Sequence, residues 1–98
     1  MLSSQCRFET QNGSKYLKQL CKHFAHKVTV EYDEVSGTAD LPPGRATLKS
    51  DESGLEVVVT AQNDTGLAIA RHIIEDHLKR FAHREPFDTL NWTIRATN

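Results

Sequence analysis

The sequence predicts an α+β domain, a two-layer sandwich in which two helices cover one face of a mainly antiparallel sheet. Period-two stretches flank two amphipathic helices, and the middle of the chain is rich in strand and turn signals. Because a single helix on each side of that middle cannot supply repeated parallel crossovers, we expect the order β-α-β-β-β-β-α-β. We expect a single domain over residues 1–98, since a chain of 98 residues normally forms one core.

The first part of the chain predicts one helix between two strands. Residues 4–10 alternate between polar and apolar side chains, as a half-buried strand does. Ser14 is a suitable N-cap for a helix over residues 14–27. The period returns to two over residues 28–32, which predicts the second strand. The helix carries an apolar stripe formed by Tyr16, Leu17, Leu20, Cys21 and Phe24.

Two consecutive hairpins are predicted next. Further strands are expected over residues 38–41, 45–49 and 55–61, the last of which contains the most β-branched run in the chain. The turns at residues 33–37 and 50–54 share an Asp-Glu pair followed by Ser-Gly. In such turns glycine offers a positive φ, so we expect the glycines to serve the turn conformation.

The last part of the chain predicts a second helix and a closing strand. Asn63 or Asp64 is a suitable cap for a helix that continues to about His83, before Pro86 prevents further helix. The closing strand alternates over residues 90–96. The apolar arc of the second helix contains Leu67, Ala70, Ile73, Ile74, Leu78 and Phe81, and the position of His77 lies inside it.

Composition and charge restrict the function. Twelve basic and thirteen acidic residues give a net charge of -1, which argues against the positive field that non-specific nucleic-acid binding needs. We see no secretory signal pattern and no apolar run of membrane-spanning length, so we expect a cytoplasmic protein with no membrane partner. The two cysteines are expected to be free thiols.

The helix over residues 14–27 carries most of the chemically capable side chains. His23 and His26 lie three residues apart, which allows both imidazoles to approach one ion, and Cys21 is near in sequence. Iron or zinc sites need three or four converging ligands, so His77 would have to supply another. The alternative is that His23 borders the apolar stripe, His26 is exposed and Cys21 is a buried hydrophobe.

Two further features have a functional and a structural interpretation. His77, inside an apolar arc, must find a hydrogen-bond partner or accept a lowered pKa, which makes it a candidate base or ligand. Alternatively it is a core histidine that donates to a backbone carbonyl or a carboxylate. The row of Lys15, Lys18 and Lys22 is a candidate contact for an anionic partner or simply a solvated helix face.

Two blocks carry a resemblance to a known family. Residues 20–27 read LCKHFAHK and residues 75–82 read EDHLKRFA, and a tryptophan follows in the closing strand. In this combination the chain resembles the bacterial family named domain of unknown function 2218. The resemblance implies a small stand-alone cytoplasmic bacterial protein and brings no activity, cofactor or catalytic residue with it. It also implies a link to genes of siderophore and iron uptake and to siderophore-interacting flavoproteins.

Three classes of function follow. The first is a non-catalytic binding or accessory protein without a cofactor, acting on a small ligand or a protein partner and linked to iron or siderophore metabolism. The second is a small metal protein or enzyme that uses His23 and His77 between the helices, with iron or zinc as the metal. The third is nucleic-acid binding, which the balanced charge disfavours. A homodimer is one way to protect the edges of an open sheet, and the sequence does not decide between a monomer and a homodimer.

Overall fold

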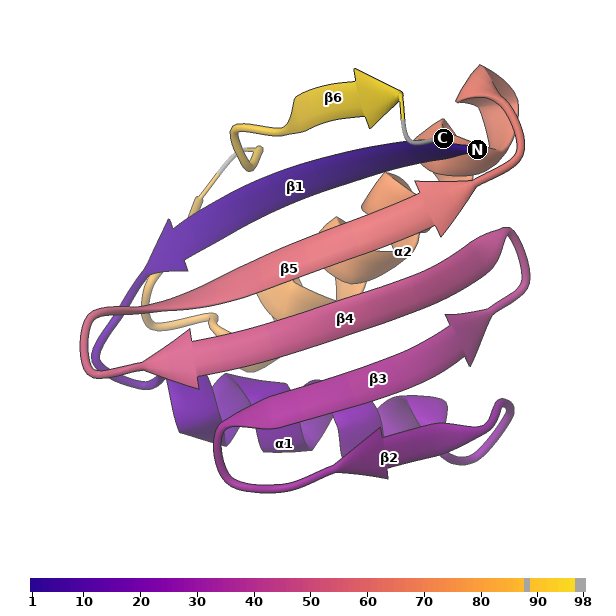
Figure 1. Ribbon diagram of the computed structural model, residues 1–98. Coiled ribbons are helices and arrows are strands. Elements are labelled where there is room, and N and C mark those ends of the chain that lie inside the picture. Colours follow the sequence, from indigo (N-terminus) through magenta and orange to yellow (C-terminus); the bar gives the residue numbers. More distant parts are fainter. Residues whose placement is uncertain (88, 97–98) are drawn as a thin grey trace.

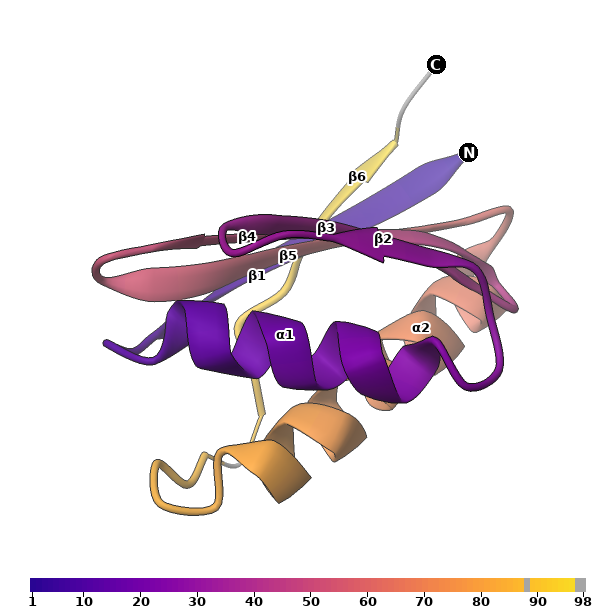
Figure 2. The same ribbon diagram turned by 90° about the horizontal axis from the view of Figure 1, so that it is seen from below.

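The computed structural model describes residues 1–87 and 89–96, in which two helices lie on one side of a six-stranded sheet (Figure 1). Seen from below, both helices lie under the same face of the sheet (Figure 2). The predicted α+β two-layer fold and the predicted element order are therefore confirmed. Neither helix within the described residues is both long and apolar enough to span a membrane.

Every strand pair in the sheet is antiparallel, and the strand order is β2-β3-β4-β5-β1-β6. β1 therefore lies between β5 and β6. Because Leu2 at the start of β1 pairs with Ala96 at the end of β6, the two ends of the described chain lie next to each other (Figure 1). The elements in chain order are β1 (Leu2–Glu9), α1 (Gly13–Phe24), β2 (Val30–Tyr32), β3 (Ser36–Leu41), β4 (Gly44–Asp51), β5 (Gly54–Ala61), α2 (Asp64–Phe81) and β6 (Thr93–Ala96).

The ends of the helices differ from the sequence prediction in two places. α1 begins one residue earlier than expected, after Asn12, and the hydroxyl of Ser14 donates to the carbonyl of Glu34 instead of capping the helix. The prediction of Ser14 as the N-cap is therefore wrong. α1 also ends at Phe24, because residues 25–27 close into tighter turns before β2. α2 begins as predicted, with the side chain of Asn63 accepting from the backbone N–H of Gly66 at 2.8 Å.

The closing strand begins later than its alternating pattern predicts. β6 starts at Thr93, and Leu90 and Trp92 precede it. The backbone N–H of Leu90 donates to the carboxylate of Glu75 on α2 at 2.6 Å, so it is not available to a neighbouring strand. Ile94, on the helix-facing side of this edge strand, remains 52% exposed. The pattern predicted the strand, but a long-range contact to α2 delays its start.

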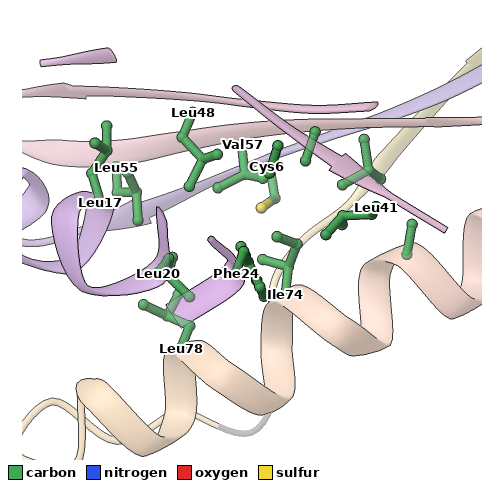
Figure 3. Close-up of a cluster of buried hydrophobic side chains, with 14 of the residues drawn as sticks. Cys6, Leu17, Leu20, Phe24, Leu41, Leu48, Leu55, Val57, Ile74 and Leu78 are labelled. Carbon is green, nitrogen blue, oxygen red and sulfur yellow. The ribbon is translucent and has the colours of Figure 1, made fainter. Parts of the chain in front are cut away.

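The core lies between the sheet and the helices (Figure 3). Leu20 and Phe24 of α1 lie beside Leu78 and Ile74 of α2 in this layer, and all four side chains are buried. All five residues of the predicted stripe of α1 are buried, as amphipathic periodicity requires. Both cysteines are free and buried. The burial of this apolar layer positions the two helices against the sheet.

Glycine has a different role from the one expected in the turns. None of the described glycines has a positive φ. Gly37 instead lies in β3 under α1, where an added Cβ would be 2.8 Å from Sγ of Cys21 and 3.1 Å from Cβ of Tyr32. The missing side chain allows α1 to approach the sheet closely, so the thiol of Cys21 packs directly on the backbone of β3.

Replacing Gly37 with alanine should therefore destabilise the fold. We expect Gly37→Ala to lower the free energy of unfolding by about 1–3 kcal/mol, as overpacking of a core does. Cys21→Ala removes the sulfur atom that the added methyl group would meet. The double variant should therefore lose less free energy of unfolding than the two single variants lose together. Urea denaturation measures each value. Cys6→Ala, three strands away, is the control, and its effect should add to that of Gly37→Ala. If the effects of Gly37→Ala and Cys21→Ala on the free energy of unfolding are additive, this packing is contradicted.

A carboxylate joins the end of α2 to the start of α1. Glu85 accepts hydrogen bonds from the hydroxyl of Thr10 at 2.7 Å, from the amide of Asn12 at 3.0 Å and from the phenol of Tyr16. Hydrogen bonds from Tyr16, Asn12 and Thr10 lower the pKa of Glu85 below its usual value of 4.5. Burial and the same hydrogen bond raise the pKa of Tyr16. This cluster holds the two helices in an antiparallel pair.

Removing the charge of Glu85 should therefore cost stability in a pH-dependent way. We expect Glu85→Gln to lower the free energy of unfolding by about 1 kcal/mol at neutral pH, since the carboxylate is only half-buried. Because the native pKa lies below 4.5, the contribution is present above that pH and disappears as the pH falls through the native value. Urea denaturation from neutral pH to below 4.5 should show that the free energies of unfolding of the wild type and Glu85→Gln converge as the pH falls. A constant difference would contradict the role of the charge.

Candidate functional site

The main candidate site is a pocket between the C-terminal end of α1, the middle of α2 and the turn between β3 and β4. It has a volume of about 210 Å³. We call it the interhelical pocket. Three side chains, His23, Lys27 and His77, supply its polar groups. Its walls are mostly apolar and are formed by Phe24, Val28, Leu41, Pro42 and Ile73. The fold therefore brings together the two histidines that the sequence placed on different helices.

The two imidazoles of the pocket are in contact. The ring centroids of His23 and His77 are 4.6 Å apart, and the ring of Phe24 lies 5.2 Å from that of His77. Nδ1 of His77 is 2.7 Å from the carbonyl oxygen of Ile73. Because a carbonyl only accepts, Nδ1 carries a proton, and in the neutral form of the ring Nε2 keeps its lone pair. His77 therefore offers a hydrogen-bond acceptor or a metal-ligand atom next to the second imidazole.

The surroundings of His23, which is an exposed residue, favour the uncharged form of its imidazole. Its pKa is lowered from 6.5, first by desolvation of the ring and then by the nearby groups His77, His26, Arg80 and Lys27. The ring also contacts that of Phe81, at 6.1 Å between centroids. A neutral imidazole keeps a free lone pair, so His23 is suited to accept a hydrogen bond or to bind a metal ion.

Cys21 and His26 lie outside this arrangement. The Cys21 side chain is buried in the core against Gly37, and burial raises the pKa of its thiol to about 11. His26 is exposed, and its ring centroid is 6.5 Å from that of His23. Within the described part of the chain, no three His, Cys, Asp or Glu side chains are grouped to hold a metal ion. The pocket therefore brings together two imidazoles, those of His23 and His77.

The lysine row lies along a separate depression on the outer side of α1. Lys15, Lys18 and Lys22 border it together with Tyr32, and its volume is about 500 Å³. Nζ of Lys18 forms an ion pair with the carboxylate of Glu34 at 2.9 Å. The row is thus present as one surface, but part of its charge is already neutralised. An anion would contact Lys15 and Lys22 more readily than Lys18.

The sequence pattern did not predict a further depression along the outer side of α2. We call it the Trp92 groove. It has a volume of about 520 Å³ and lies where Arg71, His72 and Glu75 face the segment before β6. That segment is held at α2 by the bond from Leu90 to Glu75. The only tryptophan in the sequence, Trp92, could have pointed to a surface site here, because its large apolar ring and its N–H group suit partly polar surfaces.

The lowered pKa of His23 should make the stability depend on pH. Unfolded histidine titrates near 6.5, whereas native His23 takes up its proton at lower pH. The unfolded state therefore binds more protons just below that pH, so the free energy of unfolding falls as the pH falls. We expect His23→Gln to lose less stability than the wild type between about pH 7.5 and about pH 5.5.

Urea denaturation at several pH values measures this difference, and an NMR titration of the His23 ring measures its pKa directly. His83→Gln is the matched control, because His83 is an exposed histidine outside the pocket. Its pH dependence should equal that of the wild type. Identical pH profiles for the wild type and His23→Gln would show that His23 is not perturbed.

Comparisons with known proteins identify the family. The chain is similar to the protein in "NMR structure of PA4090 from Pseudomonas aeruginosa", with 23% sequence identity, coverage of 97% of this chain and 96% of that chain, and a TM-score of 0.76. At this level of identity the similarity shows a common fold. A search of curated proteins gives no match. Residues 5–93 match the family described as "Uncharacterized protein conserved in bacteria (DUF2218)", and the chain therefore belongs to this bacterial family.

Proposed function

We propose that this protein is a small, non-catalytic binding protein of the bacterial cytoplasm and that its ligand occupies the interhelical pocket. One observation carries the proposal: a single pocket combines apolar walls with two adjacent imidazoles whose ring centroids are 4.6 Å apart. Binding sites for small molecules typically combine apolar surface with a few placed polar groups that fix orientation. Binding requires only the groups already present, an acceptor at Nε2 of His77 and a cation at Lys27.

The pocket restricts the class of ligand. Its volume of about 210 Å³ is below the roughly 300–1,000 Å³ of drug-sized sites, so it takes a single ring or one arm of a larger molecule. Nε2 of His77 selects a hydroxyl or amide donor, and Lys27 favours an acidic group. The family resemblance extends the proposal to ligands of iron or siderophore metabolism. That extension rests on the resemblance alone.

A metal ion held by His23 and His77 is the second candidate, and the short distance between the two rings favours it. Imidazole nitrogen is a common ligand of zinc and iron. Two protein ligands would leave the other coordination positions to solvent or to an organic ligand, as in open rather than structural sites. Open zinc sites have three protein ligands, so this candidate requires a third ligand from the bound organic molecule.

For the protein partner we propose a second copy of the chain. β2 and β6 are the two edges of the sheet, and they contain three and four residues. Edge strands present unpaired backbone groups that pair readily with another edge. Such a dimer would leave the interhelical pocket open, because its lining residues lie outside both edge strands.

The test is a thermal-shift screen with zinc, iron(III), ferric siderophores and small aromatic acids, followed by NMR mapping of any compound that stabilises the protein. We expect a binding compound to shift the resonances of Phe24, Val28 and Ile73, which line the pocket. His77→Phe keeps an aromatic ring beside Phe24 but removes the acceptor nitrogen, so it should weaken binding at least about tenfold. Stabilisation measures binding to the native state.

His83→Phe is the matched control, since it makes the same replacement at an exposed histidine outside the pocket. It should bind like the wild type. Zinc or iron that stabilises the wild type and neither His23→Phe nor His77→Phe would support the metal candidate. Ligands that shift only resonances away from the pocket, or that bind His77→Phe unchanged, would contradict the proposal.

A further inference from the structure

The Trp92 groove contains a cation, Arg71, that has no counter-ion among the residues that the structure describes. Arg71 lines the groove and is half-buried, and among the described residues no carboxylate forms an ion pair with it. Arg7, Arg45 and Arg80 each have such a pair. A half-buried guanidinium has five donors in a fixed plane, and it matches the two oxygens of a carboxylate or phosphate.

The carboxylate of Glu75, one helical turn from Arg71, accepts a hydrogen bond from another part of the chain. Glu75 lies at the position where a helical ion pair with Arg71 is expected, four residues along α2. Its Oε2 instead accepts the backbone N–H of Leu90 at 2.6 Å. Glu75 therefore anchors the segment that forms the other wall of the groove, and the guanidinium remains available. The charge of Glu75 lowers the affinity of the groove for any anion, and it does so most for anions that carry more than one charge.

The opposite wall supplies apolar surface and further donors. Leu90 is buried and Trp92 is half-buried, so both contribute apolar surface to the groove. Asn91 is exposed and also lines it. The indole N–H of Trp92 is buried, and no acceptor for it exists among the described residues.

We infer that the Trp92 groove binds a small aromatic monocarboxylate. The carboxylate pairs with the guanidinium of Arg71 and accepts from the amide of Asn91, and the ring lies against Leu90 and Trp92. Aromatic faces favour such contacts with another ring. A dianionic phosphate has the same oxygen chemistry but meets the charge of Glu75. The groove shares no lining residue with the interhelical pocket, so this inference is independent of the proposed function.

Trp92 is the only tryptophan, which makes the test direct. Benzoate is titrated into the full chain at constant ionic strength, and the indole resonance and tryptophan fluorescence are followed. We expect saturable changes in both, with shifts at residues 71–75 and 90–92. Methyl benzoate, which lacks the charge, should bind at least about tenfold more weakly, and phenyl phosphate should bind more weakly than benzoate.

The variants separate a specific site from general attraction of anions. Arg71→Met should weaken benzoate binding at least about tenfold, and Arg71→Lys should weaken it less because it keeps the charge. Arg84→Met is the matched control, because Arg84 is exposed and outside the groove, and it should bind like the wild type. Asn91→Leu provides a second variant should Arg71→Met fail to fold. An unchanged indole resonance, or equal effects at Arg71 and Arg84, would overturn the inference.

Discussion

The structure depends on the burial of one apolar sheet face under only two helices. The side chains that face each other across this layer, such as Leu20, Leu48 and Leu78, are completely buried. Burial of apolar side chains is the main favourable contribution to folding, so the helices must lie where the sheet is most apolar. Two helices do not cover six strands, and Ile94 of the edge strand stays half-exposed on the helix-facing side. A surface depression, the Trp92 groove, lies where the helices no longer cover the sheet.

α2 contributes to both candidate sites, which lie on opposite sides of it. Its side toward α1 carries His77 in the interhelical pocket, and its outer side carries Arg71 in the Trp92 groove. The two sites differ in chemistry: the pocket offers imidazoles between apolar walls, and the groove offers a guanidinium beside an indole. One helix can therefore support two different kinds of recognition without any change in the core that it covers.

Local patterns were sufficient to predict the fold class and the buried stripe of α1, because periodicity records which side chains must face the core. They also placed His23 at the border of the apolar stripe of α1 and His77 inside the apolar arc of α2, and the two rings meet once the helices pack. The strand order and the late start of β6 could not be predicted. They depend on pairings such as that of Leu90 with Glu75, which join segments distant in sequence. The Trp92 groove was missed for the same reason.

The antiparallel arrangement of the helices sets the distance between the two imidazoles. α1 contacts the segment that follows α2 through Tyr16 and Glu85, and it contacts α2 itself through His23 and His77. The two contact points are seven residues apart on α1, which is about two helical turns. From His77 to Glu85 the chain runs eight residues, and it leaves the helix after Phe81. The Glu85 cluster therefore fixes one end of the helix pair. The interhelical pocket lies away from this cluster, where the rings of His23, Phe24 and His77 contact one another between the helices.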